Sequence, residues 1–236
     1  MKQYQDLFFD FDDTLCDTHH NAEEALKEVF GYFHFENYYA QYQSFHDTYW
    51  KNNIYLWERY ARQEITFREL TIERFKVPLQ EAFQDRGPDD EFCMEINSKF
   101  LELCAQKTGV VDGAHELIDY LKSKNYRVHL CSNGPHDIQY RKLESTGFIN
   151  DFETINLSED IGANKPSILF FRYALEKTGA LPEYTLMIGD NYDTDIEGGM
   201  KAGLDTLLFD PQNQYENLSV KPTFTVNSLK EITKIL

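Results

Sequence analysis

Asp10-Phe11-Asp12-Asp13-Thr14 follows directly on the apolar run Leu7-Phe8-Phe9 near the start of the chain. A short apolar run that ends in charged residues is typical of a buried strand. In open α/β sheets, ligands bind at the carboxyl ends of the strands, which is where these aspartates would lie. The stretch therefore predicts the first strand of a sheet and an acidic site at its end.

Four further segments show the same pattern as residues 4–12. They are predicted to form strands at 126–133, 151–157, 184–190 and 205–210. Helical patterns separate them, one with Asp112 as its cap and one with Pro166 as its first residue. Strands that alternate with helices favour a mostly parallel sheet covered on both faces. We therefore expect an α/β, Rossmann-like fold.

Residues 17–108 interrupt this alternation. Apolar residues recur there at helical spacing, and Thr66 with Glu69 is typical of a capping box that opens a helix. No run in this block has the pattern of a strand. We expect two domains, an α/β core of residues 1–16 and 109–236 and an all-helical cap of residues 17–108 inserted after the first strand.

Aromatic residues are frequent in the first half of the expected helical domain. Some of them could stack on a nucleobase. They could equally fill the core of a small helical domain, where large rings supply most of the buried area. Tyr38, Tyr42, Phe45 and Tyr49 recur at helical spacing, which favours the second interpretation.

Polar residues also end or follow the other predicted strands. Ser132-Asn133 ends the second, Asp190 ends the fourth with Asp195 close behind, and Asn164-Lys165-Pro166 lies between the third and fourth. Two carboxylates ~4 Å apart repel by roughly 4 kcal/mol at an effective dielectric near 20, so such a cluster favours a bound cation. An all-oxygen site favours Mg²⁺, which bridges to substrate phosphates. The ion, Lys165 and the Ser132 hydroxyl would together hold a phosphate dianion.

The spacing of Asp10 and Asp12 suits two different roles. One carboxylate can attack phosphorus and form an aspartyl-phosphate. The other can protonate the leaving oxygen and then activate water. Each short motif alone is ordinarily a loop, a turn or a surface lysine. Their joint appearance, in order and each at the end of a predicted element, is what indicates an active site.

These residues resemble the haloacid dehalogenase-like hydrolase superfamily, whose four motifs correspond to DFDDT at 10–14, Ser132, Lys165 and GDNYDTD at 189–195. The resemblance implies that the helical insertion is a type-1 cap. It implies that Asp10 is the nucleophile and that Asp12 is the acid/base, which also offers a backbone carbonyl to the metal. On this basis we predict catalytic residues Asp10, Asp12 and Lys165, phosphate-binding residues Ser132, Asn133 and Lys165, metal ligands Asp10, Asp12 and Asp190, and supporting residues Thr14 and Asp195.

The resemblance also separates branches of the superfamily. Dehalogenases lack the second aspartate and need no metal, so Asp12 argues against them. Asp13 differs from the serine of phosphoserine phosphatases and the glycine of phosphoglucomutase-like members. DFDDTL, CSNG and SEDIGANKP are most similar to the nucleotidase-like branch, although Gly162-Ala163-Asn164 departs from its usual residues. We expect a Mg²⁺-dependent phosphatase acting on a nucleoside monophosphate or a sugar phosphate.

Two other functions share parts of this pattern. A phosphomutase would pass the phosphoryl group to another substrate hydroxyl, and a receiver-like signalling module would keep a stable aspartyl-phosphate without turnover. Asp12 argues against the receiver, because it is placed to hydrolyse the intermediate. A helical insertion also has no purpose in a receiver.

Composition restricts the partners. The net charge of −17 argues against nucleic-acid polymers and anionic membranes. We find neither a signal peptide nor an apolar run long enough for a membrane helix. The four cysteines lack zinc-type spacing, which favours reduced thiols in the cytoplasm. We expect a small phosphorylated metabolite as the partner and favour a monomer.

Overall fold

The computed structural model describes residues 3–80, 83, 87–215, 218 and 220–236. The chain divides into two compact units, Met1–Thr18 with Thr108–Leu236, and His19–Lys107. We call them the core unit and the helical unit. The domain ranges predicted from the sequence include residues 1–2, 81–82, 84–86, 216–217 and 219, which lie outside the described residues.

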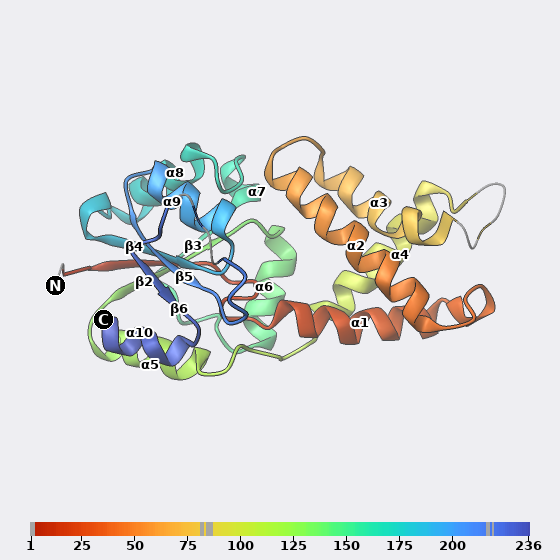
Figure 1. Ribbon diagram of the computed structural model, residues 1–236, viewed down its shortest axis with the longest axis horizontal. Coiled ribbons are helices and arrows are strands. Elements are labelled where there is room, and N and C mark those ends of the chain that lie inside the picture. The colour runs from red at the N-terminus through yellow and green to blue at the C-terminus, as the bar shows by residue number, and fades with distance from the viewer. Residues whose placement is uncertain (1–2, 81–82, 84–86, 216–217, 219) are drawn as a thin grey trace. The chain divides into compact units, whose positions relative to one another are not determined.

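The core unit contains a parallel sheet of six strands in the order β3-β2-β1-β4-β5-β6 (Figure 1). The strands are β1 Asp6–Phe9, β2 Arg127–Ser132, β3 Thr154–Leu157, β4 Thr185–Gly189, β5 Asp205–Phe209 and β6 Phe224–Val226. Every neighbouring pair is parallel. The predicted α/β fold is confirmed, and the first five strands lie within their predicted ranges. The sixth strand was not predicted, because three residues are too short for a recognisable alternation.

Strand order explains where a site can form. From β1 the chain first adds strands on one side of the sheet, β2 and then β3. It then returns to the other side of β1 to form β4 and β5. The boundary between β1 and β4 is therefore the topological switch point, the position at which open α/β sheets bind ligands.

Helices cover both faces of this sheet (Figure 1). They are α5 Ala114–Ser123, α6 His136–Ser145, α7 Ser158–Ile161, α8 Ile168–Thr178, α9 Gly198–Lys201 and α10 Leu229–Ile235. Side chains alternate along β1, so Leu7 and Phe9 belong to the apolar cluster that includes residues of α5 and α10. Phe8 belongs to the opposite cluster with Phe170 and Phe171 of α8. Burial on both faces explains the continuous apolar run that precedes Asp10.

Two predicted helix starts are wrong by one or two residues. Asp112 does not cap α5; the cap position is Gly113, at φ 83°, and the Asp112 carboxylate instead pairs with Lys230 Nζ at 2.7 Å. Pro166 is not the first residue of α8, because the Ser167 hydroxyl caps the helix by accepting from the Leu169 N–H. Both errors are local, since a left-handed glycine or a serine cap moves a helix start without changing its apolar face.

The helical unit contains α1 Thr18–Tyr32, which begins in the core unit, α2 Tyr42–Ala61, α3 Phe67–Gln80 and α4 Asp90–Cys104, with a short 3₁₀ turn at Phe35–Asn37. The predicted capping box before α3 is confirmed: the Thr66 N–H donates to Glu69 Oε2 at 2.7 Å, and the Glu69 N–H donates to Thr66 Oγ1 at 3.2 Å. The described residues of this unit form no strand.

The aromatic residues of the helical unit mainly form its core. Phe45 and Tyr49 are fully buried within one apolar cluster, and Tyr42 packs against it. Tyr38 differs, because it is 50% exposed and stacks on Phe83.

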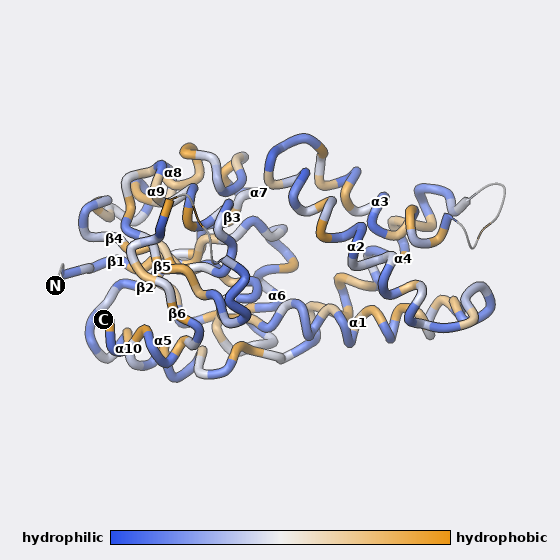
Figure 2. Tube along the Cα trace, viewed as in Figure 1, coloured by the Kyte–Doolittle hydropathy of each residue, from blue (hydrophilic) through white to orange (hydrophobic). Residues whose placement is uncertain are grey.

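Apolar segments also mark the sheet in the core unit, most clearly along β5 (Figure 2). Across the described ranges, no helix is both long and apolar enough to cross a membrane.

Candidate active site

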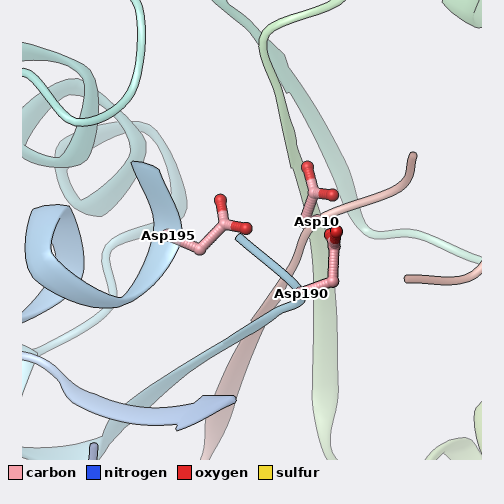
Figure 3. A group of neighbouring side chains, drawn as sticks. All are labelled: Asp10, Asp190 and Asp195. Atoms are coloured by element: carbon pink, nitrogen blue, oxygen red, sulfur yellow. The ribbon is translucent and has the colours of Figure 1, made fainter. Parts of the chain in front are cut away.

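Three carboxylates meet at the switch point of the sheet. Asp10 follows β1, Asp190 follows β4, and Asp195 lies in the π-helical turn Tyr192–Glu197 that comes next. One oxygen from each lies within 4.8 Å of the other two. Figure 3 shows Asp195 approaching the other two side chains from the segment after β4. The sequence predicted Asp10 and Asp190 as neighbours, and the structure brings them together.

Gly189 allows this approach. A Cβ atom built at this position would lie 2.3 Å from Asp195 Oδ2, far inside contact distance. Asp195 is fully buried, and the same Oδ2 accepts from the Asn191 N–H at 3.2 Å. Close packing of the acidic group therefore requires a glycine at position 189.

Lys165 supplies the positive charge of this group. Its Nζ donates to Asp10 Oδ1 and to Asp195 Oδ1, both at 2.6 Å, and its side chain is 2% exposed. Lys165 thus pairs with two of the three carboxylates, and Asp190 lies beside them in the same group. A net negative charge remains in a buried place, which a divalent cation would offset.

The pKa values reflect this imbalance. Burial raises the pKa of Asp10 to about 7; the charges of Asp195 and Asp12 add to the rise, and Lys165 opposes it. Burial also raises the pKa of Asp190 well above its ordinary value, with Asp10 and Asp195 adding to it. Burial alone would lower the pKa of Lys165, but the two carboxylates raise it above its ordinary value. The group is thus short of positive charge, and its all-carboxylate donor set fits Mg²⁺.

The Thr14 hydroxyl lies beside two of the three carboxylates. Its Oγ1 donates to Asp190 Oδ1 at 3.0 Å and accepts from the Asp190 N–H at 3.1 Å. Asp10 Oδ2 lies 3.4 Å from the same hydroxyl. One threonine therefore links the loop after β1 to the loop after β4.

The Asn133 side chain binds the backbone of Lys165. Its Oδ1 accepts from the Lys165 N–H at 2.7 Å, and its Nδ2 donates to the Lys165 carbonyl at 2.9 Å. The side chain thereby fixes the backbone of the lysine. Phosphate binding by Asn133 stays a prediction.

Asp12 lies outside the group of three carboxylates. Its Oδ1 accepts from Thr18 Oγ1 at 2.7 Å and from Lys142 Nζ, and its Oδ2 accepts from Gln139 Nε2 at 2.6 Å. Ser132 Oγ is more distant, at 3.4 Å from Oδ2. Burial acts to raise the pKa of Asp12, but the charge of Lys142 and the hydrogen bonds from Lys142, Thr18 and Gln139 together lower it. A metal contact by Asp12 was predicted through its backbone carbonyl and stays a prediction.

Sequence reasoning missed two residues of this arrangement, Gln139 and Lys142. Both lie on α6, three positions apart, so they share one face of the helix that follows Ser132. Their partner Asp12 is 127 and 130 positions away, respectively. A glutamine and a lysine at helical spacing directly after a predicted site loop were the available signal.

With this fold and this site, the protein is an α/β enzyme whose active site contains several aspartates at the switch point of a parallel sheet. The chain belongs to the haloacid dehalogenase-like hydrolase family, whose model matches residues 7–203. The family and the enzyme class predicted from the sequence, a hydrolase, are thereby confirmed.

Several relatives extend over most of the chain. The pyrimidine 5'-nucleotidase PynA of Streptococcus pneumoniae is 30% identical over 99% of this chain and 95% of its own length. The pyrimidine 5'-nucleotidase YjjG of Escherichia coli is 31% identical over 77% of each chain. The magnesium-bound crystal structure of the HAD-hydrolase YfnB of Bacillus subtilis superposes with a TM-score of 0.87, at 30% identity, over 100% of this chain and 99% of that one.

The raised pKa of Asp10 predicts a pH dependence of stability. Between its ordinary value of 3.8 and about 7, the folded protein keeps a proton that the unfolded chain has lost. The contribution of this carboxyl to the free energy of unfolding therefore falls as the pH rises through that interval. An asparagine at position 10 has no such proton. In chelator, we expect the melting temperature of Asp10→Asn to rise relative to wild type from about pH 4 to about pH 7, as measured by thermal unfolding. A difference in melting temperature between the two proteins that stays constant with pH would contradict the raised pKa of Asp10.

Proposed function

We propose that the protein is a Mg²⁺-dependent phosphomonoesterase that works through an aspartyl-phosphate at Asp10. The observation that carries the proposal is the meeting of the Asp10, Asp190 and Asp195 oxygens within 4.8 Å, beside the ammonium of Lys165. A bound phosphate requires positive charge at a site where the protein itself is acidic. The ammonium and a divalent ion would supply it together.

Each side chain has a role in this proposal. Mg²⁺ would be held by Asp10 and Asp190, with Asp195 beside them and the backbone carbonyl of Asp12 as a further ligand, and when bound it would neutralise charge on the phosphate. Lys165 and the Ser132 hydroxyl would orient the phosphoryl group.

The reaction would proceed in two balanced steps. A carboxylate oxygen of Asp10 forms a bond to phosphorus while the ester P–O bond breaks, and Asp12 gives its proton to the departing oxygen. Water then attacks phosphorus and Asp12 takes a proton from it. The bond between Asp10 and phosphorus breaks, which releases inorganic phosphate.

We propose nucleoside 5'-monophosphates as the substrate class. Support comes from two relatives that are named as pyrimidine 5'-nucleotidases and align over 99% and 77% of this chain. A glyceraldehyde 3-phosphate phosphatase of Methanothermobacter thermautotrophicus is 39% identical, but over only 39% of this chain. Sugar phosphates are therefore the second substrate class to test.

A cytoplasmic location also stays a proposal. Cys16, Cys93, Cys104 and Cys131 are all buried and none is in a disulfide, and none belongs to a candidate metal-binding group among the described residues. Reduced, packed cysteines suit a reducing compartment. The favoured monomeric state stays a prediction.

The direct test is release of inorganic phosphate from nucleoside monophosphates, sugar phosphates and phosphonates in the presence of Mg²⁺. Chelation with EDTA is expected to lower the rate by more than about 100-fold, and excess Mg²⁺ to restore it, because a catalytic metal ion contributes several kcal/mol to transition-state stabilisation. Undiminished hydrolysis in chelator would refute the metal-dependent mechanism. An isomerised phosphate ester without phosphate release would indicate a mutase, and a lasting phospho-Asp10 without turnover a receiver-like module.

A further inference from the structure

The Asp12 carboxylate is surrounded by donors in this structure. Thr18 and Lys142 occupy Oδ1, and Gln139 and, more distantly, Ser132 occupy Oδ2. A carboxylate has about four acceptor positions, so these four donors occupy its acceptor positions. The side chain is nevertheless 31% exposed, so one edge stays open to solvent.

The Gln139 contact depends on a glycine. A Cβ atom at Gly134 would lie 2.3 Å from Gln139 Nε2 and 2.5 Å from its Cδ, so any larger residue would displace the amide. The fully buried Gln139 uses its Nε2 for both Asp12 and Ser132 Oγ, the latter at 2.5 Å. The loop after β2 and the helix α6 are thus packed around this one amide.

Lys142 is held as firmly. Its side chain is 10% exposed, and its Nζ lies 3.5 Å from Thr18 Oγ1 in addition to its ion pair with Asp12. The ion pairs of these two lysines form two separate systems. Lys165 serves Asp10 and Asp195, whereas Lys142 serves Asp12.

We propose that Lys142 and Gln139 are positioning residues that aim the Asp12 carboxyl at the leaving-group oxygen. The inference rests on the proposed phosphatase function. Among the four donors, Ser132 makes the longest contact, and its hydroxyl is the one predicted to turn to the phosphate. When it does so, a position on Oδ2 is freed, from which the protonated carboxyl can donate to the leaving-group oxygen. Lys142 on Oδ1 and Gln139 on Oδ2 still hold the plane of the carboxyl.

Two other roles for Lys142 would give different kinetics. A lysine that only stabilises the fold would alter the melting temperature and leave the rate per folded molecule unchanged. A lysine that bound the phosphate itself would affect all phosphate esters alike. A lysine that acts through Asp12 matters in proportion to how strongly the leaving group needs a proton.

The test compares two substrates in the full-length enzyme with Mg²⁺. p-Nitrophenolate is a weak base and leaves without protonation, whereas the alcohol of a nucleoside monophosphate requires it. For Lys142→Met, we expect kcat/KM to fall about 10–100-fold on the nucleoside monophosphate and less than about 3-fold on p-nitrophenyl phosphate. Lys142→Arg keeps the charge and should recover part of the loss. Lys122→Met is the matched control, because it removes a Lys–Asp pair, with Asp151 at 2.7 Å, from the exposed surface of the same unit.

A double variant tests whether the loss of activity in Lys142→Met depends on Asp12. On Asp12→Asn, the added Lys142→Met change should lower the nucleotide rate by less than about 3-fold, because coupled residues are not additive. A larger further loss, or equal losses on both substrates, would overturn the proposal. If Lys142→Met does not fold, as judged by thermal unfolding, Gln139→Leu takes its place in both tests, the comparison of two substrates and the combination with Asp12→Asn. If the wild type releases no phosphate from either ester, it is the phosphatase function that fails.

Discussion

Asp10→Asn is expected to fold normally and to lose more than about 10⁴-fold in kcat, on the scale found when a catalytic nucleophile is removed. The amide cannot attack phosphorus, so no aspartyl-phosphate forms. The fold should tolerate the change, because it removes one charge from a crowded acidic group. Lys165 keeps its second partner, Asp195 Oδ1 at 2.6 Å.

Phosphate release and thermal unfolding would be measured on the same preparation. Asp137→Asn, an exposed aspartate in the first turn of α6, is the matched control and should keep wild-type activity. A separate measurement identifies the intermediate: borohydride reduction of the wild-type enzyme during turnover should convert position 10 to homoserine, detectable by peptide mass. Residual turnover above about 1% of wild type, or a reduced aspartate elsewhere, would refute the nucleophile assignment.

Lys165→Met is expected to have the largest effect on stability. It leaves the buried Asp10 and Asp195 carboxylates without their shared ammonium, next to the Asp190 carboxylate. Removing one partner of a buried ion pair costs about 3–5 kcal/mol. For a chain of this size, that loss corresponds to a fall of roughly 6–20 °C in melting temperature. Activity should fall by about 10²–10³-fold as well, because the lysine is a phosphate-binding donor in the proposed mechanism.

Two measurements, one with Mg²⁺ and one with a second substitution, separate loss of the Lys165 charge from loss of its packing as the cause of the lower stability. In the variant, Mg²⁺ should raise the melting temperature more than in the wild type, because the ion replaces the missing charge. Adding Asp195→Asn should also recover part of the lost stability by removing one carboxylate. Lys122→Met, at an exposed pair, should cost less than about 1 kcal/mol. If neither the ion nor the second change gives any recovery, charge in the acidic group is not what Lys165 balances.

Local sequence patterns were sufficient for much of the fold. The five predicted strands are real, because apolar runs buried on both faces of a parallel sheet need no long-range information to be recognised. The capping box of Thr66 and Glu69 is likewise contained in four consecutive residues. The predictions for Asp112 and Pro166 were wrong, because a helix start depends on backbone angles and caps that the apolar pattern does not specify.

Local patterns in the chain were enough to predict the α/β class, the inserted helical segment, and the aspartates and the lysine that lie at one edge of the sheet. Their types and order were visible because each follows a recognisable strand or precedes a helix. Their partners depend on how the chain folds: Lys165 bridges Asp10 and Asp195, Asn133 binds the lysine backbone, and α6 brings Lys142 to Asp12. The physical reason is distance along the chain, since these pairs are 155, 30, 32 and 130 positions apart and only strand order makes them neighbours.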